Sequence, residues 1–199
     1  RRIGVFWGMW WKRCMLRWFG SCALALSAGS AFAADTDGEA WRLVREGRAA
    51  VILRHARAPG TGDPAGFQLD DCATQRNLSD AGRDQARRIG DLLRANGIVH
   101  ARVYSSQWCR CLETAELLGL GLVELLPALN SFFAAPRREA EQTAALMSFL
   151  AGWAGDQPLV LVTHQVNITA IADVFPAEGE VLIILLRDGT PEVLARLKV

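Results

Sequence analysis

Two short apolar runs constrain the fold more than any other feature of the sequence. Residues 49–53 and 158–163 are apolar almost without interruption, which is typical of strands buried on both faces of a sheet. The first run is followed by Arg54 and His55, and the second by His164. Because a sheet buried on both faces needs helices on either side, the two runs predict a layered α/β fold.

Helix and turn signals separate the apolar runs. Ser79 is a good N-cap for a helix that continues to about Ala95, and Asn96-Gly97 is a typical end for it. Helices are also expected over residues 38–47, 107–118, 136–153 and from His164 to about Asp173. Strands are expected over residues 99–105, 120–125, 181–186 and 191–198. A hairpin turn at Asp188-Gly189 is expected to join the last two strands. Strands that alternate with helices predict a three-layer α/β/α sandwich with a mainly parallel sheet.

The ends of the predicted strands carry the residues of greatest chemical interest. Ligands of such folds bind at the carboxyl ends of the strands. Arg54, His55 and His164 end two strands, and Arg110 follows a third at the start of a helix. A neutral imidazole is a competent nucleophile near neutral pH, and guanidinium groups pair with phosphate oxygens. The four residues therefore predict a phosphoryl-transfer site, with a second, protonated histidine as a further donor. His100 lacks this context and is expected to be structural.

Segments of the chain resemble, in order, the motifs of a known family. Residues 53–56, Leu-Arg-His-Ala, resemble an Arg-His-Gly signature, and residues 105–115 resemble a second motif in which a serine is followed by Arg and then Thr-Ala. Residues 161–164, Leu-Val-Thr-His, are similar to the segment with the second histidine, and residues 77–82 also look like the family's helix start. The family is the histidine phosphatase superfamily, branch 1, and the resemblance to it spans about residues 49–175.

The resemblance implies a phosphoglycerate-mutase-like fold and a mechanism. His55 would accept the phosphoryl group as phosphohistidine, and Arg54, Arg110 and His164 would bind its oxygens. Water would then release phosphate. The resemblance implies neither a metal nor an organic cofactor.

The chain departs from the family pattern at several positions. Ala56 replaces the usual glycine, and Thr163 and Gln165 flank the second histidine, as in the small phosphohistidine phosphatases. Many members also have a glutamate as general acid about twenty residues after the second arginine, where residues 127–133 of this chain contain no acid. The sequence leaves three candidates for that role: Asp63, Asp71 and Glu139.

The N-terminal third contains a predicted export signal. In residues 1–33, the basic residues Lys12, Arg13 and Arg17 precede an uncharged run over residues 18–30, and Ala31-Phe32-Ala33 is an A-x-A cleavage pattern. This is the signature of a secretory signal peptide, and it predicts cleavage before Ala34. The phosphatase domain is then expected over residues 34–199. We expect a periplasmic location and no stable membrane insertion after cleavage. The alternative is an N-terminal membrane anchor, for which the apolar run is short.

Charge and cysteine content limit the partners. The leader holds five of the 22 basic residues and none of the 21 acidic ones, so the rest of the chain has a net charge of −4 and no general attraction for nucleic acid. In an oxidising compartment, Cys72 is expected to form a disulfide with Cys109 or Cys111. The spacing of these cysteines is not that of a structural zinc site.

These observations predict an exported phosphatase with a small phosphorylated substrate. By analogy with exported relatives, a cell-envelope phosphate such as a lipopolysaccharide sugar phosphate would suit the export signal. Two alternatives stay open. A non-catalytic phosphate-binding protein fits the missing glutamate, although binding alone does not need His55. A phosphohistidine phosphatase also fits the missing glutamate, although the export signal does not favour it.

Overall fold

The computed structural model describes residues 36–155 and 157–199. The leader predicted over residues 1–33 lies outside the described residues. The elements follow one another as α1 (Thr36–Arg45), β1 (Ala50–Arg54), η1 (Cys72–Thr74), α2 (Asp80–Ala95), β2 (Arg102–Ser105), α3 (Cys109–Leu118), β3 (Val123–Leu125), η2 (Pro127–Leu129), η3 (Pro136–Arg138), α4 (Glu139–Ala151), β4 (Leu159–Thr163), α5 (Gln165–Ala172), β5 (Val181–Arg187) and β6 (Thr190–Leu197), where η denotes a 3-10 helix.

The six strands form one sheet in the order β3-β2-β4-β1-β5-β6. The first four strands in this order pair in parallel, whereas β5 is antiparallel to β1 and β6 is antiparallel to β5. The last two strands are joined at Asp188 and Gly189, both of which have positive φ. The predicted mainly parallel sheet and the C-terminal hairpin are therefore confirmed.

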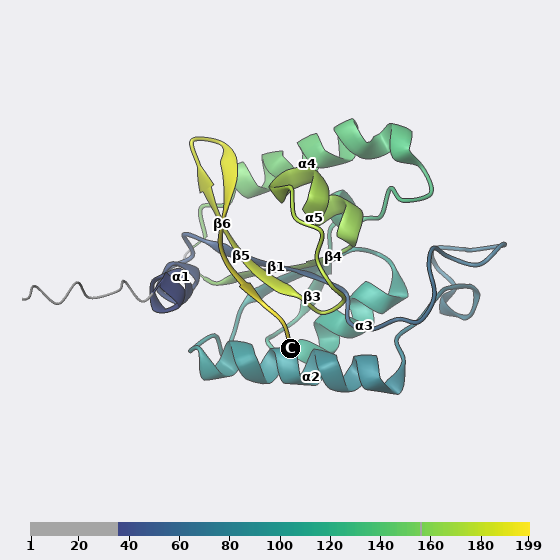
Figure 1. Cartoon of the computed structure of the whole chain (residues 1–199), viewed down its shortest axis with the longest axis horizontal. Coiled ribbons are helices and arrows are strands. Elements are labelled where there is room, and N and C mark those ends of the chain that lie inside the picture. The colour runs from purple at the N-terminus through teal and green to yellow at the C-terminus, as the bar shows by residue number, and fades with distance from the viewer. Residues whose placement is uncertain (1–35, 156) are drawn as a thin grey trace, which may run out of the picture. The chain divides into compact units, whose positions relative to one another are not determined.

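Helices cover both faces of the sheet (Figure 1). On β1, Val51 and Leu53 pack in the hydrophobic cluster that also contains residues of α1, α2 and α3. Ala50 and Ile52 point to the opposite face and pack in the cluster with α4 and α5. Because successive side chains of a strand alternate between faces, an apolar strand of this kind supplies both cores. The expected three-layer sandwich is thus confirmed.

Two predicted strands begin later than expected, and glycines with positive φ lie at or just before each predicted start. Gly119 ends α3 in the left-handed conformation, and Gly121 has φ +143°, so the third strand begins at Val123 rather than at residue 120. Likewise, Gly97 has φ +82°, Val99 is exposed, and pairing begins only at Arg102. These turns leave the carboxyl ends of the strands, where the predicted site lies, unchanged.

A disulfide joins Cys72, in η1, to Cys109, in the first turn of α3, with 5.7 Å between their Cα atoms. The predicted disulfide is therefore present, and the partner that the sequence left open is Cys109. Cys111 is a free, buried cysteine. In residues 36–155 and 157–199, no helix has both the length and the apolar content needed to cross a bilayer.

Candidate active site

The candidate site lies where parallel strands end side by side. The backbone N–H of His55 donates to the carbonyl of Thr163 at 2.9 Å, which extends the pairing of β1 with β4 to the first histidine. The ring centroids of His55 and His164 are 5.6 Å apart, and Arg110 Nη2 lies 3.4 Å from His164 Nδ1. Arg54 lines the same pocket. The structure thus brings together all four residues that the sequence analysis placed at this edge of the sheet.

His55 is held as a neutral imidazole with one free nitrogen. Its side chain is almost fully buried, and Nδ1 lies 2.8 Å from the carbonyl oxygen of Ala56. Because a carbonyl oxygen only accepts hydrogen bonds, this contact assigns the proton to Nδ1 and leaves the lone pair on Nε2. Burial, reinforced by the charge of Arg110, holds the pKa of His55 well below its ordinary value of 6.5.

His164 has the opposite tautomer. Its Nδ1 faces Arg110, which can only donate, so Nε2 carries the proton and donates to Ser106 Oγ at 2.9 Å. Burial and the charge of Arg110 hold the pKa of His164 well below 6.5. His164 is therefore neutral in this structure, because a buried imidazole beside a fixed guanidinium charge loses its proton. That it is protonated when it donates to a phosphate oxygen stays a prediction.

Three guanidinium groups surround the pocket, one more than the sequence predicted. The pocket has a volume of about 250 Å³, and Arg54, Arg76 and Arg110 line it; we call it the arginine pocket. Arg76 donates from Nε to the carbonyl of Gly62 at 2.8 Å and also hydrogen bonds to the carbonyl of Ala58. Desolvation lowers the pKa of Arg54 and of Arg76, but guanidinium groups keep their charge at physiological pH.

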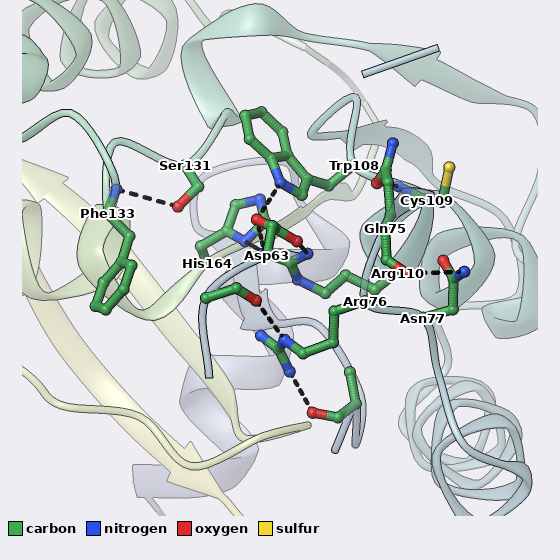
Figure 2. A network of polar contacts seen from close by, with 12 residues as sticks. Asp63, Gln75, Arg76, Asn77, Trp108, Cys109, Arg110, Ser131, Phe133 and His164 are labelled. Carbon is green, nitrogen blue, oxygen red and sulfur yellow. Dashed lines mark hydrogen bonds and ion pairs between the residues drawn. The ribbon is translucent and has the colours of Figure 1, made fainter. Parts of the chain in front are cut away.

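One carboxylate lies inside the arginine pocket (Figure 2). Asp63 Oδ1 is 2.5 Å from Arg110 Nη1, and Oδ2 is 3.4 Å from Arg110 Nη2 and 2.9 Å from Nε1 of Trp108. The other two acids that the sequence offered lie elsewhere. Asp71 caps η1 by accepting the N–H of Ala73 at 3.0 Å, and Glu139 begins α4 and lines a separate hollow.

Glu178 is a second carboxylate near the pocket. Its Oε1 is 3.6 Å from Arg54 Nη2 and 3.6 Å from Arg76 Nη1, and it also accepts the N–H of Ala58 at 3.3 Å. Glu178 is not among the lining residues of the pocket. It therefore balances the charge of the two arginines from outside the lining, and Asp63 is the carboxylate within the lining.

The turn between β2 and α3 is fixed by side chains that the sequence analysis did not single out. Asn130 Oδ1 accepts the N–H of Gln107 at 2.9 Å and the hydroxyl of Ser106 at 3.3 Å. Trp108 stacks on Phe67, with ring centroids 5.2 Å apart. Trp108 lies within the second motif but is not one of the residues that define it, and Arg76 has no motif or periodic context, so only the three-dimensional arrangement identifies them.

The disulfide lies next to the site. Cys109 directly precedes Arg110, and its N–H donates to Gln75 Oε1 at 3.0 Å, so the segment that carries Arg76 is tied to the start of α3. Burial raises the pKa of the Cys111 thiol to about 12, which makes Cys111 a poor nucleophile. Within residues 36–155 and 157–199, no three His, Cys, Asp or Glu side chains gather as metal ligands.

Comparisons with known proteins agree with this geometry. The family model of the histidine phosphatase superfamily (branch 1) matches residues 50–132. Among solved structures, the protein histidine phosphatase SixA in complex with tungstate is 18% identical, with 75% of this chain and 96% of that chain covered and a TM-score of 0.53. The comparison with curated protein sequences found no significant match.

Two further solved structures share the fold. A phosphoserine phosphatase from Entamoeba histolytica in complex with 3-phosphoglyceric acid is 14% identical, over 76% of this chain and 97% of that one, with a TM-score of 0.56. A mycobacterial glucosyl-3-phosphoglycerate phosphatase is 19% identical, over 73% of this chain and 96% of that one, with a TM-score of 0.53. The chain thus has the fold of the histidine phosphatases and matches, over residues 50–132, the sequence pattern of branch 1 of that superfamily.

Proposed function

We propose that the chain is a branch 1 histidine phosphatase that hydrolyses a phosphomonoester through a phosphohistidine on His55. The observation that carries the proposal is the tautomer of His55. Its Nδ1 is engaged by the Ala56 carbonyl, so the free Nε2 belongs to a neutral side chain that lines a pocket with three arginines. A binding protein needs the arginines but not an imidazole held in this way.

The proposed reaction has two steps. Nε2 of His55 attacks phosphorus, the bond to the leaving alcohol breaks, and water then cleaves the N–P bond. Arg54 and Arg110 bind the phosphoryl oxygens, because guanidinium groups match them with paired donors. His164 joins them once the negative charge of the bound phosphate raises its pKa. Loss of one such donor typically costs about 3–4 kcal/mol in the barrier.

The rim of the arginine pocket is suited to a leaving group that is neutral and has an apolar face. Phe133 and Phe175, which both line the pocket, are 54% and 72% exposed, unusual values for large aromatic side chains. In the described lining, the ionised residues are the three arginines and Asp63. A sugar ring suits such a rim, since its C–H face packs on aromatic rings while its hydroxyls bond to polar neighbours such as Ser131. Together with the predicted export signal, this favours a sugar phosphate of the cell envelope.

The first test compares the wild-type domain with His55→Ala in the release of phosphate from an aryl phosphate. We expect His55→Ala to lose activity by roughly 10³-fold or more. His100→Ala is the matched control, because His100 is exposed and remote from the pocket lining, and it should keep wild-type activity. Full activity in His55→Ala would refute the phosphohistidine step. A wild-type protein that binds phosphate without hydrolysing any ester would favour the phosphate-binding alternative.

The substrate is tested with esters that differ in the charge of the alcohol. We expect a hexose phosphate to be hydrolysed with a lower KM than phosphoserine or 3-phosphoglycerate, whose leaving groups are charged. Phe175→Ala should raise KM for the hexose phosphate, whereas Leu122→Ala, at a residue that is 90% exposed and outside the pocket lining, should not. An equal KM for charged and neutral esters would contradict the proposed substrate class, and a faster reaction on a phosphohistidine peptide would favour the other alternative.

A further inference from the structure

Asp63 occupies the side of Arg110 on which a phosphate would bind. Its two oxygens face the two terminal nitrogens of Arg110, at 2.5 Å and 3.4 Å. A carboxylate in this position makes the same paired contacts with a guanidinium as two oxygens of a phosphoryl group would make. The Arg110 side chain is almost fully buried, so it has little free surface on which to bind a second anion beside Asp63. A phosphate that binds Arg110 must therefore displace Asp63.

The segment that carries Asp63 allows such a displacement. Residues 58–66 contain no helix or strand, and Gly60 and Gly62 have positive φ, a conformation that other residues rarely adopt. Ala58 packs in a small apolar cluster, and beyond it the segment makes polar contacts, among them the hydrogen bond from Arg76 to the carbonyl of Gly62. A segment with few apolar anchors moves at low cost compared with the strands that carry the histidines.

Trp108 keeps the displaced carboxylate near the site. Its indole N–H donates to Asp63 Oδ2 at 2.9 Å, while Oδ1 makes the short contact with Arg110. The indole is itself fixed by stacking on Phe67 and by an edge contact with His164, with centroids 5.2 Å and 5.3 Å away. Asp63 can therefore lose its contacts with Arg110 and still remain hydrogen bonded at the edge of the pocket.

We propose that Asp63 closes the phosphate site through its contacts with Arg110 and acts as the general acid after the substrate's phosphoryl group has displaced it. This inference rests on the proposed phosphatase function. It assigns to one residue the role that the sequence left open among Asp63, Asp71 and Glu139, of which only Asp63 lines the arginine pocket.

Phosphate binding changes the charges around Asp63. Burial alone would raise the pKa of Asp63, but hydrogen bonds from Arg110 and Trp108 and the charge of Arg76 lower it below its ordinary value. The remaining neighbour, His164, is neutral. A bound phosphoryl group removes the hydrogen bonds from Arg110 and adds negative charge beside the carboxylate, and both changes favour the protonated acid.

The proton then has a defined path. Asp63 takes up a proton from solvent as the phosphoryl group binds. As Nε2 of His55 forms its bond to phosphorus, the bond from phosphorus to the ester oxygen breaks, and Asp63 gives its proton to that oxygen, which leaves as the alcohol. In the second step the Asp63 carboxylate takes a proton from the attacking water, the N–P bond breaks, and phosphate leaves with His55 neutral again.

The test uses Asp63→Asn, which keeps the size of the side chain but removes its charge and its acid. Glu139→Gln is the matched control, since Glu139 begins α4 outside the arginine pocket. Binding of inorganic phosphate is measured by calorimetry in buffers of different ionisation enthalpy, which also reports proton uptake. Hydrolysis is measured on an aryl phosphate with an activated leaving group and on an alkyl phosphate with a poor one.

We expect Asp63→Asn to bind phosphate at least about tenfold more tightly, because it lacks the competing charge. It should also take up fewer protons than the wild type, in which both Asp63 and His164 gain a proton as phosphate binds. Its kcat should fall by about 10²–10⁴ on the alkyl ester and little on the activated one. Weaker or unchanged phosphate binding would overturn the closing role, and an equal loss on both esters would overturn the acid role. A wild-type protein inactive on both esters would instead overturn the proposed function and the acid role with it, while the binding measurement would still decide the closing role.

Discussion

At the scale of single residues, two buried histidines share a pocket but hold their protons on different nitrogens. Sequence position predicted where His55 and His164 lie, because each follows an apolar strand. It did not predict the charge of His164, because burial depends on the elements packed around a residue, here the turn with Ser106 and the start of α3. Arg76 was missed for a similar reason, since its loop has no pattern that aims the side chain at the site.

The assigned tautomers predict a specific NMR result. We expect ¹⁵N spectra to show the proton on Nδ1 of His55 and on Nε2 of His164, with both rings neutral at about pH 6, because burial and Arg110 lower both pKa values. His55→Ala and His164→Asn would assign the signals. A doubly protonated His164 at that pH in the absence of phosphate would contradict the structure.

Arg110 should be sensitive even to a change that keeps its charge. Lysine cannot make the paired contacts of a guanidinium. We therefore expect Arg110→Lys to lower kcat/KM by about 10²-fold or more on an aryl phosphate, with little change in the circular dichroism spectrum. Arg102→Lys, on β2 beside Glu124, is the control and should keep wild-type activity. Similar kinetics in the two variants would show that Arg110 contributes only charge.

At the scale of elements, the types of the helices and strands followed from the sequence, whereas some boundaries did not. Apolar runs and the Ser79 cap are local signals, and they predicted β1, β4 and α2 to within about one residue. The starts of β2 and β3 depend on glycines with positive φ and on where neighbouring strands begin to pair. Which cysteine pairs with Cys72 depends on the position of η1 relative to α3, and no local sequence pattern predicts that position.

The Cys72–Cys109 disulfide should stabilise the protein measurably. It closes a loop of 37 residues, for which the chain-entropy relation gives about 3–4 kcal/mol. We expect Cys72→Ser to lower the free energy of unfolding by up to that amount in oxidising buffer, measured by urea denaturation. Under reducing conditions the wild type and Cys72→Ser should have nearly equal stability. No difference in oxidising buffer would mean that the bond constrains neither η1 nor α3.

At the scale of the whole molecule, the sheet explains why the fold and the site were predictable together. The same apolar strands form both cores and end at the catalytic candidates, so the pattern that identified the fold also located His55 and His164. The pocket walls come instead from the loops at residues 58–66, 127–134 and 173–180. The sequences of these loops do not predict how the loops pack against one another. The sequence therefore left Asp63 as one of three candidate acids.

The two buried neutral histidines also couple stability to pH. Their pKa values are lower in the folded chain than the ordinary value of 6.5, so the unfolded chain binds more protons below that pH. Stability should therefore be fully present above pH 6.5 and fall below it, by up to about 1.4 kcal/mol per pH unit for each histidine. Urea unfolding between about pH 7 and pH 5 tests this, and His55→Ala should reduce the slope. An equal slope in both proteins would show that His55 does not contribute.

The contact between Asp63 and Arg110 also bears on product inhibition. In the proposed reaction, orthophosphate leaves a pocket in which the tethered Asp63 carboxylate can bind Arg110 again. Rebinding of the product then has to compete with an intramolecular anion at high effective concentration. The carboxylate lowers the affinity of the pocket for every anion. A substrate recovers part of that affinity because its alcohol contacts the aromatic rim, whereas orthophosphate has no alcohol to make these contacts. The contact of Asp63 with Arg110 should therefore discriminate against free phosphate, and we expect turnover to continue in phosphate-rich surroundings.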